Sequence, residues 1–83
     1  MATSHFVHIL YSEKHHRHYV GMSRDVNSRL KSHNEGKVTS TKPYIPWKVV
    51  HVEAHTSISQ ARSREKYLKS AAGRRWRKNN LKM

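Results

Sequence analysis

Three short apolar runs alternate with polar segments along the chain, and each has the composition of a β-strand. Residues 5–11 and 17–21 are rich in β-branched and aromatic side chains, and residues 47–53 have few polar interruptions. The polar stretch 12–16 between the first two runs has a length typical of a hairpin connection. The pattern therefore predicts a β-hairpin followed later by a third strand.

One helix and one loop are predicted between the second and third strands. Ser23 is the expected N-cap, Asp25 favours the positive end of the helix dipole, and Gly36 is expected to end the helix. These signals place a helix over about 24–35. Two prolines in the segment 37–46 indicate a loop before the third strand.

The C-terminal third of the chain predicts two further helices. Ser57 followed by Gln60 fits a capping box and is expected to open the first of them. Gly73 is expected to interrupt this helix, after which residues 74–81 can form a short and very basic last helix. Trp76 is expected to anchor that helix to the core.

The predicted order of elements is strand, strand, helix, strand, helix, helix. This order is typical of the α+β class, with a small three-stranded, largely antiparallel sheet flanked by helices. A chain of 83 residues is long enough for one modest core. Residues 1–83 are therefore expected to form a single domain.

The charge of the chain indicates a polyanionic partner. It carries 17 Lys and Arg against 5 acids, a formal net charge of +12, and its pI is near 10.7. Basic residues are spread over every segment instead of forming one amphipathic helix, which favours nucleic acid over a membrane surface. We expect DNA as the partner, and either a monomer or a weak homodimer.

The cellular setting can also be predicted from composition. The chain has no cysteine, which fits a reducing, intracellular environment. No apolar run approaches the roughly twenty residues needed to span a membrane, and the N-terminus lacks the layout of a signal peptide. We therefore expect a cytoplasmic protein that associates with the nucleoid when it binds DNA.

A carboxylate occupies a position in the penultimate helix where an apolar residue is expected. The helical stripe that contains it consists of Ile58, Ala61, Glu65, Leu68 and Ala72. A carboxylate on the buried side of a basic helix needs a paired cation, hydrogen bonds or a metal. The alternative is an i,i+4 pair between Glu65 and Lys69 on a solvated face.

Five stretches of the chain together resemble a known family. They are Val7-His8-Ile9-Leu10, His18-Tyr19-Val20-Gly21, Asp25 to Gly36, Lys42-Pro43 through Pro46-Trp47, and Ala61 to Lys69. In this order they resemble the GIY-YIG nuclease superfamily, and more narrowly its small single-domain bacterial members. Those proteins are similar to the nuclease domains of excision-repair incision enzymes and certain homing endonucleases. The resemblance implies DNA cleavage.

The resemblance assigns roles position by position. Tyr19 matches the tyrosine of the family's second tripeptide, Arg29 its helix arginine, and His33 a polar residue one turn later. Glu65 matches the metal-binding glutamate, which implies Mg²⁺ or Mn²⁺ as the cofactor. His8 stands where the first tripeptide has tyrosine.

His8 leaves three interpretations open. The first tyrosine of the family is a candidate base for activating water, and imidazole, with a pKa near 6.5, takes that role more easily than phenol, with a pKa near 10. Alternatively Tyr11 could swing into the site. The third interpretation is that the protein has lost cleavage and retains binding.

Phosphodiester hydrolysis needs an activated water and positive charge at the phosphorus. Glu65 would hold one Mg²⁺, Arg29 would neutralise the phosphate, and Tyr19 with His8 would orient or deprotonate the water. His33 would assist through a hydrogen bond or a leaving-group proton. Each residue also has a plain structural interpretation, such as Tyr19 packing on the sheet or His33 as a cation at a helix C-terminus.

Other basic residues are expected to contact the nucleic-acid backbone. They are Arg17, Arg24, Arg29, Lys31, Lys42, Arg62, Lys69, Arg74 and Arg75.

The histidines at 15, 16 and 18 are expected to face DNA and not to bind a transition metal, because adjacent side chains in an extended chain point apart. Asn79 and Asn80 are expected to be solvated.

Two functions follow from these observations. The leading one is a Mg²⁺-dependent DNA endonuclease that selects by structure and not by sequence, since the chain has no base-reading motif. The alternative is a non-catalytic nucleic-acid-binding module with a degenerate nuclease site.

Overall fold

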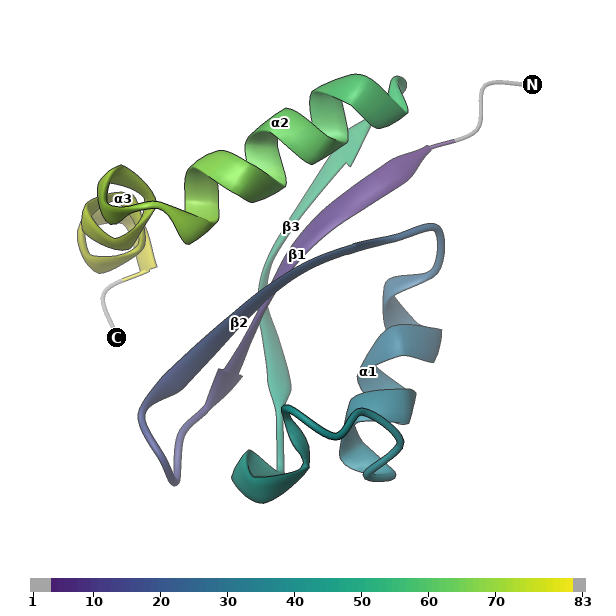
Figure 1. Ribbon diagram of the computed structural model, residues 1–83, viewed down its shortest axis with the longest axis vertical. Helices are drawn as coiled ribbons and strands as arrows, with labels where there is room; N and C mark the ends of the chain where they lie inside the picture. The colour runs from purple at the N-terminus through teal and green to yellow at the C-terminus, as the bar shows by residue number, and fades with distance from the viewer. Residues whose placement is uncertain (1–3, 82–83) are drawn as a thin grey trace.

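The computed structural model describes residues 4–81 and contains the predicted elements in the predicted order (Figure 1). They are β1 (His5–Ser12), β2 (Arg17–Ser23), α1 (Val26–Asn34), a 3₁₀ turn η1 (Lys42–Tyr44), β3 (Lys48–His55), α2 (Ile58–Lys69) and α3 (Ala71–Leu81). The α+β class and the β-β-α-β-α-α order are confirmed. The helices described are all too short and too polar to cross a bilayer.

The sheet has β1 at its centre, with the order β2-β1-β3 and antiparallel pairing on both sides. In β1 and β2, His8 pairs with Gly21 and Ile9 pairs with Val20. Directly paired residues of antiparallel strands point to the same face, and successive residues point to opposite faces. The register therefore sorts the strand residues into two faces, and β2 forms an open edge of the sheet.

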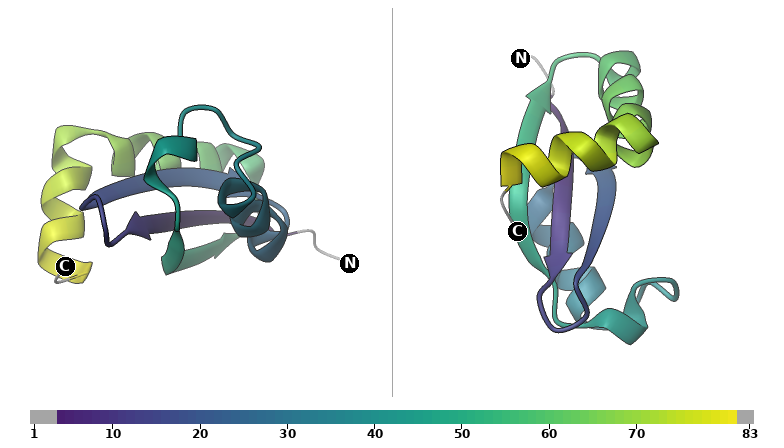
Figure 2. Two further views of the ribbon diagram at one scale, coloured as in Figure 1. Left: turned by 90° about the horizontal axis from the view of Figure 1, so that it is seen from below. Right: turned by 90° about the vertical axis from the view of Figure 1, so that its left-hand side faces the viewer.

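The apolar core lies on one face of the sheet, beneath α2 and α3. It consists of Val7, Ile9, Val20, Ala61 and Leu68, and the partly buried Trp76 and Leu81 of α3 pack against it. α2 runs along the strands, whereas α3 crosses them (Figure 2). The expected role of Trp76 as an anchor is confirmed.

The opposite face of the sheet is covered in part by α1 and contains more polar side chains. His8 lies on this face and is 1% exposed, and His33 of α1 is fully buried there. Buried imidazoles on this face and aliphatic residues on the other make the two sides of the sheet chemically different.

α1 begins and ends with recognisable caps. Asp25, and not the predicted Ser23, is the N-cap, because its carboxylate accepts a hydrogen bond from the Ser28 amide at 3.1 Å. At the other end Gly36 has a φ of +77°, which a residue without Cβ adopts readily. The Gly36 and Lys37 amides donate to the carbonyls of His33 and Ser32, so the helix ends in a Schellman motif as the glycine predicts.

The break between α2 and α3 lies at Ser70 and not at the predicted Gly73. Ser70 has an extended backbone, and its hydroxyl accepts a hydrogen bond from the Gly73 amide at 3.2 Å. Gly73 is buried in the first turn of α3, where a Cβ would lie 2.3 Å from the carbonyl oxygens of Tyr67 and Leu68. Gly73 is therefore needed for the close approach of two helices and does not end either of them. The predicted cap of α2 is confirmed, since the Gln60 amide donates to the Ser57 hydroxyl.

Candidate active site

His8 and Tyr19 are brought together on the α1 face of the sheet by the pairing of β1 with β2. Gly21, which pairs with His8, leaves the space that both side chains occupy. A Cβ built at Gly21 would lie 2.9 Å from His8 Nε2 and 3.0 Å from Tyr19 Cε2. The glycine of the Tyr-Val-Gly stretch therefore makes room for the two candidate catalytic rings.

His33 reaches the same cluster from α1. Its ring centroid lies 4.8 Å from that of Tyr19, and its Nδ1 lies 2.7 Å from the Thr41 hydroxyl. That hydroxyl donates to the Val38 carbonyl at 3.3 Å, so it accepts from His33 Nδ1–H. This arrangement leaves His33 Nε2 as an unprotonated acceptor, which is buried and has no hydrogen-bond partner among residues 4–81.

Arg29 places positive charge beside both histidines. The pKa of His8 is lowered to about 4, first by burial and then by the charges of His33 and Arg29. Burial and Arg29 also lower the pKa of His33. Both imidazoles are therefore neutral at pH 7, and neither ring nitrogen of His8 has a hydrogen-bond partner within the described chain.

Glu65 approaches from the other face of the sheet. Ala61 and Leu68 of α2 are buried against the sheet, while Arg64 extends to the Glu53 carboxylate on β3. Since successive helical residues are about 100° apart, Glu65 faces the opposite flank of α2, toward the open edge at β2. Four of the predicted site residues thus share the α1 face, and Glu65 comes to the β2 edge from the α2 face.

Glu65 forms the i,i+4 ion pair with Lys69 that the sequence analysis gave as the alternative to a buried carboxylate. Lys69 Nζ lies 3.4 Å from Glu65 Oε2, and the glutamate side chain is 24% exposed. The predicted apolar stripe was wrong at Ile58, which is 48% exposed. Glu65 is therefore a half-buried carboxylate held by one exposed lysine, which an approaching cation can displace.

The donor set fits a hard cation that retains most of its water. Within residues 4–81 no three His, Asp or Glu side chains gather into a metal site. A single carboxylate suits Mg²⁺, which takes its remaining ligands from water and phosphate oxygens, and does not suit Zn²⁺, which needs several protein ligands. Glu65 is the residue that would hold such an ion.

A family model identifies the family of this chain: the model of the GIY-YIG catalytic domain matches residues 4–80. The chain belongs to the GIY-YIG family. This family is part of a nuclease superfamily, whose members typically use a divalent metal. The expected resemblance is therefore confirmed over almost the whole sequence.

Relatives and a solved structure agree with this family. Two UPF0213 proteins from strains of Staphylococcus epidermidis are each 38% identical over 66 residues, which is 78% of this chain and 76% of theirs. The solution NMR structure of a UPF0213 protein from Bacillus halodurans has a TM-score of 0.53 and is 29% identical, covering 88% of this chain and 80% of the other. The chain is thus similar to bacterial UPF0213 proteins in sequence and fold.

Tyr11 does not join the cluster of His8, Tyr19 and His33. Because three is an odd spacing along a strand, Tyr11 lies on the face opposite to His8. Its ring contacts that of His18 at a centroid distance of 4.8 Å, and its hydroxyl lies 3.2 Å from His16 Nδ1. The interpretation in which Tyr11 replaces the first tyrosine is therefore wrong for this structure.

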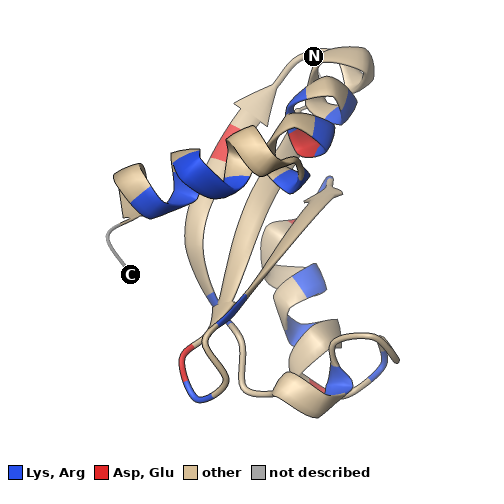
Figure 3. Cartoon of the chain, turned by 60° about the vertical axis from the view of Figure 1, so that its left-hand side comes forward, with Lys and Arg blue, Asp and Glu red and all other residues tan. Residues whose placement is uncertain are grey.

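The predicted nucleic-acid contacts are spread over the GIY-YIG domain. Lys and Arg lie on all three helices and on the hairpin (Figure 3). Arg24, Lys31, Lys42, Arg62 and Arg75 are exposed, Lys69 pairs with Glu65, and Arg17 and Arg74 line a hollow described below. Asn79 and Asn80 are also exposed, and the Asn80 amide donates to the Trp76 carbonyl within α3.

An ion-pair network that the sequence analysis missed lies on the core side. The Glu53 carboxylate accepts three hydrogen bonds from Arg64 at 2.9 to 3.1 Å and lies 2.7 Å from His51 Nε2 and 3.3 Å from His55 Nε2. Although burial opposes ionisation, these partners lower the Glu53 pKa to about 2. The strand spacing of His51, Glu53 and His55 at i, i+2 and i+4 could have indicated it, because such residues share a face.

Proposed function

We propose that this GIY-YIG protein is a metal-dependent endonuclease that hydrolyses phosphodiester bonds in DNA and selects its substrate by structure. The observation that carries the proposal is the cluster of His8, Tyr19, Arg29 and His33 at one face of the β2 edge, with Glu65 reaching that edge from the other face. A backbone phosphate lying across the edge near Gly21 would be approached from both sides.

Arg29 supplies the positive charge that a phosphoryl transition state needs. Its guanidinium is near enough to His8 and His33 to lower the pKa of both imidazoles. A phosphodiester that binds Arg29 would neutralise this charge where negative charge accumulates on the phosphorus oxygens. Arg29 would also hold the phosphate by paired N–H donors, which fix its orientation.

His8 is the residue we assign as the proton acceptor for the attacking water. A neutral imidazole has a lone pair available, and the nitrogens of His8 are not engaged by any of residues 4–81. Its pKa of about 4 makes it a weak base in the free protein. Burial is the largest cause of this lowered pKa, and an anionic phosphate would offset only the smaller contribution of Arg29, so the pKa of His8 would rise in part when the substrate binds.

Tyr19 and His33 would position the reactants. The Tyr19 ring packs between His33 and Trp47, which fixes the ring plane. His33 is fixed by Thr41, and its free Nε2 can accept a hydrogen bond from the water or from the Tyr19 hydroxyl. When bound at Glu65, Mg²⁺ or Mn²⁺ would supply charge stabilisation for the departing or attacking oxygen.

A non-catalytic nucleic-acid-binding module remains the second candidate because of a specific observation. His8 is 1% exposed and electrically neutral, so water reaches it poorly in the free protein. The engagement of Glu65 by Lys69 is also compatible with a site that has lost its metal. In this interpretation the basic surface binds DNA and no bond is broken.

The two candidates are separated by a cleavage assay with matched variants. Flapped, branched, single-stranded and duplex DNA would be incubated in Mg²⁺ or Mn²⁺ with the native protein, Glu65→Gln and Glu35→Gln. Glu35 is exposed and pairs with Lys37, so its replacement makes the same change in net charge away from the cluster. We expect cutting by the native protein and by Glu35→Gln, and none by Glu65→Gln. Binding without cutting by all three proteins would favour the second candidate.

A further inference from the structure

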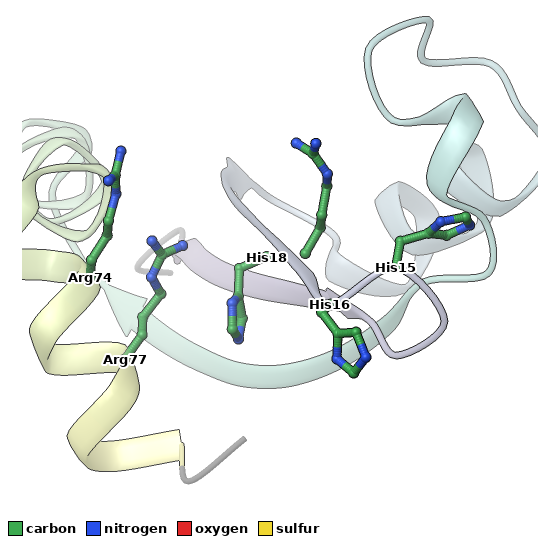
Figure 4. Close-up of a pocket in the computed structure, with 6 residues that line it drawn as sticks. His15, His16, His18, Arg74 and Arg77 are labelled. Carbon is green, nitrogen blue, oxygen red and sulfur yellow. The ribbon is translucent and has the colours of Figure 1, made fainter.

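A hollow of about 530 Å³ lies between the hairpin and α3, on the other side of β2 from Tyr19. Its six lining residues are all basic or imidazole side chains: His15, His16, Arg17, His18, Arg74 and Arg77. Figure 4 shows the arginines of α3 on one side and the histidines of the hairpin on the other. We call it the hairpin–α3 hollow.

No Asp or Glu side chain compensates the charge of this hollow within residues 4–81. The chain has five acids, all within residues 4–81, and each is engaged elsewhere. Their partners are Lys48 for Glu13, the Ser28 amide for Asp25, Lys37 for Glu35, Arg64 for Glu53, and Lys69 for Glu65. The arginines at 17, 74 and 77 consequently have no ion-pair partner in the described chain, and an anion from outside would be needed to neutralise them.

The two arginines of α3 are held close enough to repel each other. They are three residues apart and therefore lie on one side of the helix. Arg77 is partly buried, and burial together with the charge of Arg74 lowers the pKa of Arg77. The charge of Arg77 in turn contributes to lowering the pKa of His18. Such mutual destabilisation is relieved when an anion binds between the charges.

The hollow is continuous with the candidate active site along β2. A second cavity, lined by Tyr19, Thr41, Tyr44 and Trp47 among others, shares Arg17 and His18 with the hollow. The Arg17 guanidinium lies 4.3 Å from the Tyr44 ring centroid, which fixes it at the junction. A chain of phosphates that entered at Tyr19 would thus meet Arg17 next and then α3.

We propose that the hairpin–α3 hollow binds a backbone phosphate of the same nucleic-acid strand that is held at the active site. The proposal rests on the proposed function for the identity of the ligand, and it adds the path of the strand, from Tyr19 past Arg17 to Arg74 and Arg77. An anionic membrane surface fits less well, because no apolar side chain lines the hollow.

The test compares two double variants with the same loss of charge. Arg74→Gln with Arg77→Gln removes two charges from the hollow. Lys66→Gln with Lys78→Gln also removes two charges, but both side chains are exposed and neither lines the hollow. Binding of a fluorescent duplex and a fluorescent single strand would be measured by anisotropy over a range of salt concentrations, and folding would be checked by circular dichroism.

We expect the hollow variant to make the log-log salt slope for the duplex shallower by about 0.9, the contribution of the one phosphate contact that it removes. The matched variant should change the slope by less than half as much. Equal effects of the two variants would overturn the proposal, as would binding of anionic vesicles, but not of DNA, that depends on Arg74 and Arg77.

Cleavage measured in parallel separates this proposal from the proposed function. If the native protein cuts DNA and the hollow variant binds and cuts equally well, the nuclease function stands and the hollow proposal fails. If the native protein never cuts, but the hollow variant alone loses binding, the hollow proposal stands and the nuclease function fails. Absence of any DNA binding by the native protein would overturn both.

Discussion

His8 lies directly beneath Gly21, and no side chain larger than hydrogen fits between them. The two residues pair across β1 and β2, and a Cβ at position 21 would come within 2.9 Å of His8 Nε2. The conformational freedom of glycine is not what this position requires. The requirement is space for an imidazole and for the neighbouring Tyr19 ring.

Gly21→Ala should therefore displace His8 and destabilise the protein. We expect a loss of about 1–3 kcal/mol, as for other overpacked sites, measured by urea denaturation, together with loss of DNA cleavage. His8→Ala in the Gly21→Ala background should cost less stability than His8→Ala alone, because the clash has been removed. Additive effects of the two substitutions would show that the His8 ring is not the group displaced.

Replacement by glutamine should destabilise the protein much more at Glu53 than at Glu65. Glu65→Gln removes one exposed i,i+4 pair and should change the free energy of unfolding by less than about 0.5 kcal/mol while abolishing cleavage. Glu53→Gln leaves Arg64 without its carboxylate at a site where the glutamate is 19% exposed, and should destabilise by about 2–4 kcal/mol. Chemical denaturation of both variants checks this, and a larger loss for Glu65→Gln would refute the assignment.

Acid should destabilise the protein in two successive pH windows. The pKa of His8 is about 4 in the folded protein and near 6.5 when unfolded. Between pH 6.5 and 4, His8 is therefore protonated in the unfolded chain and neutral in the folded protein, which favours unfolding. Stability from His8 is therefore complete above pH 6.5 and is lost as the pH falls toward 4. Glu53, with a folded pKa of about 2, loses its contribution between about pH 4.5 and 2.

Denaturation of His8→Tyr at several pH values tests the first window. This substitution places the tyrosine of the family motif at position 8 and removes one titrating imidazole. The slope of the free energy of unfolding against pH between 6.5 and 4 should become shallower by up to one proton, which is about 1.4 kcal/mol per pH unit. His33 and His18, whose pKa values are also lowered, should maintain the remaining slope. An unchanged slope would place the titration elsewhere.

Thr41→Val should release His33 from its single tautomer. The substitution removes the hydroxyl that lies 2.7 Å from His33 Nδ1 and leaves a buried donor unpaired. We expect a loss of about 1–3 kcal/mol and a change in the nitrogen-15 chemical shifts of the His33 ring from the pattern of an Nδ1–H tautomer. Ser40→Ala, at the exposed neighbouring position, serves as the control and should change neither quantity.

The sequence by itself determined the elements, the helix ends at Gly36 and Ser57, and the family. Runs rich in β-branched and aromatic residues located the strands, and Gly36 ended α1 where its positive φ is required. These features depend on neighbours in the chain, so local patterns are sufficient to predict them. Tyr19, Arg29 and Glu65 could be proposed as site residues because each matches a position in the motifs that carry the resemblance to the family, and their roles stay a prediction.

Tertiary structure alone decided which charges have partners. Helical periodicity predicted that Glu65 points inward. In the structure Glu65 pairs with Lys69 on its own helix, and the acid that forms an ion pair between α2 and the sheet is Glu53 on β3. Likewise Arg77 lines the hairpin–α3 hollow because α3 crosses the strands beside the hairpin, which lies far away in the sequence. A periodic pattern defines the faces of one helix or strand. Burial and electrostatic pairing depend on which other element covers each face, and the covering element is fixed only when the whole chain has packed.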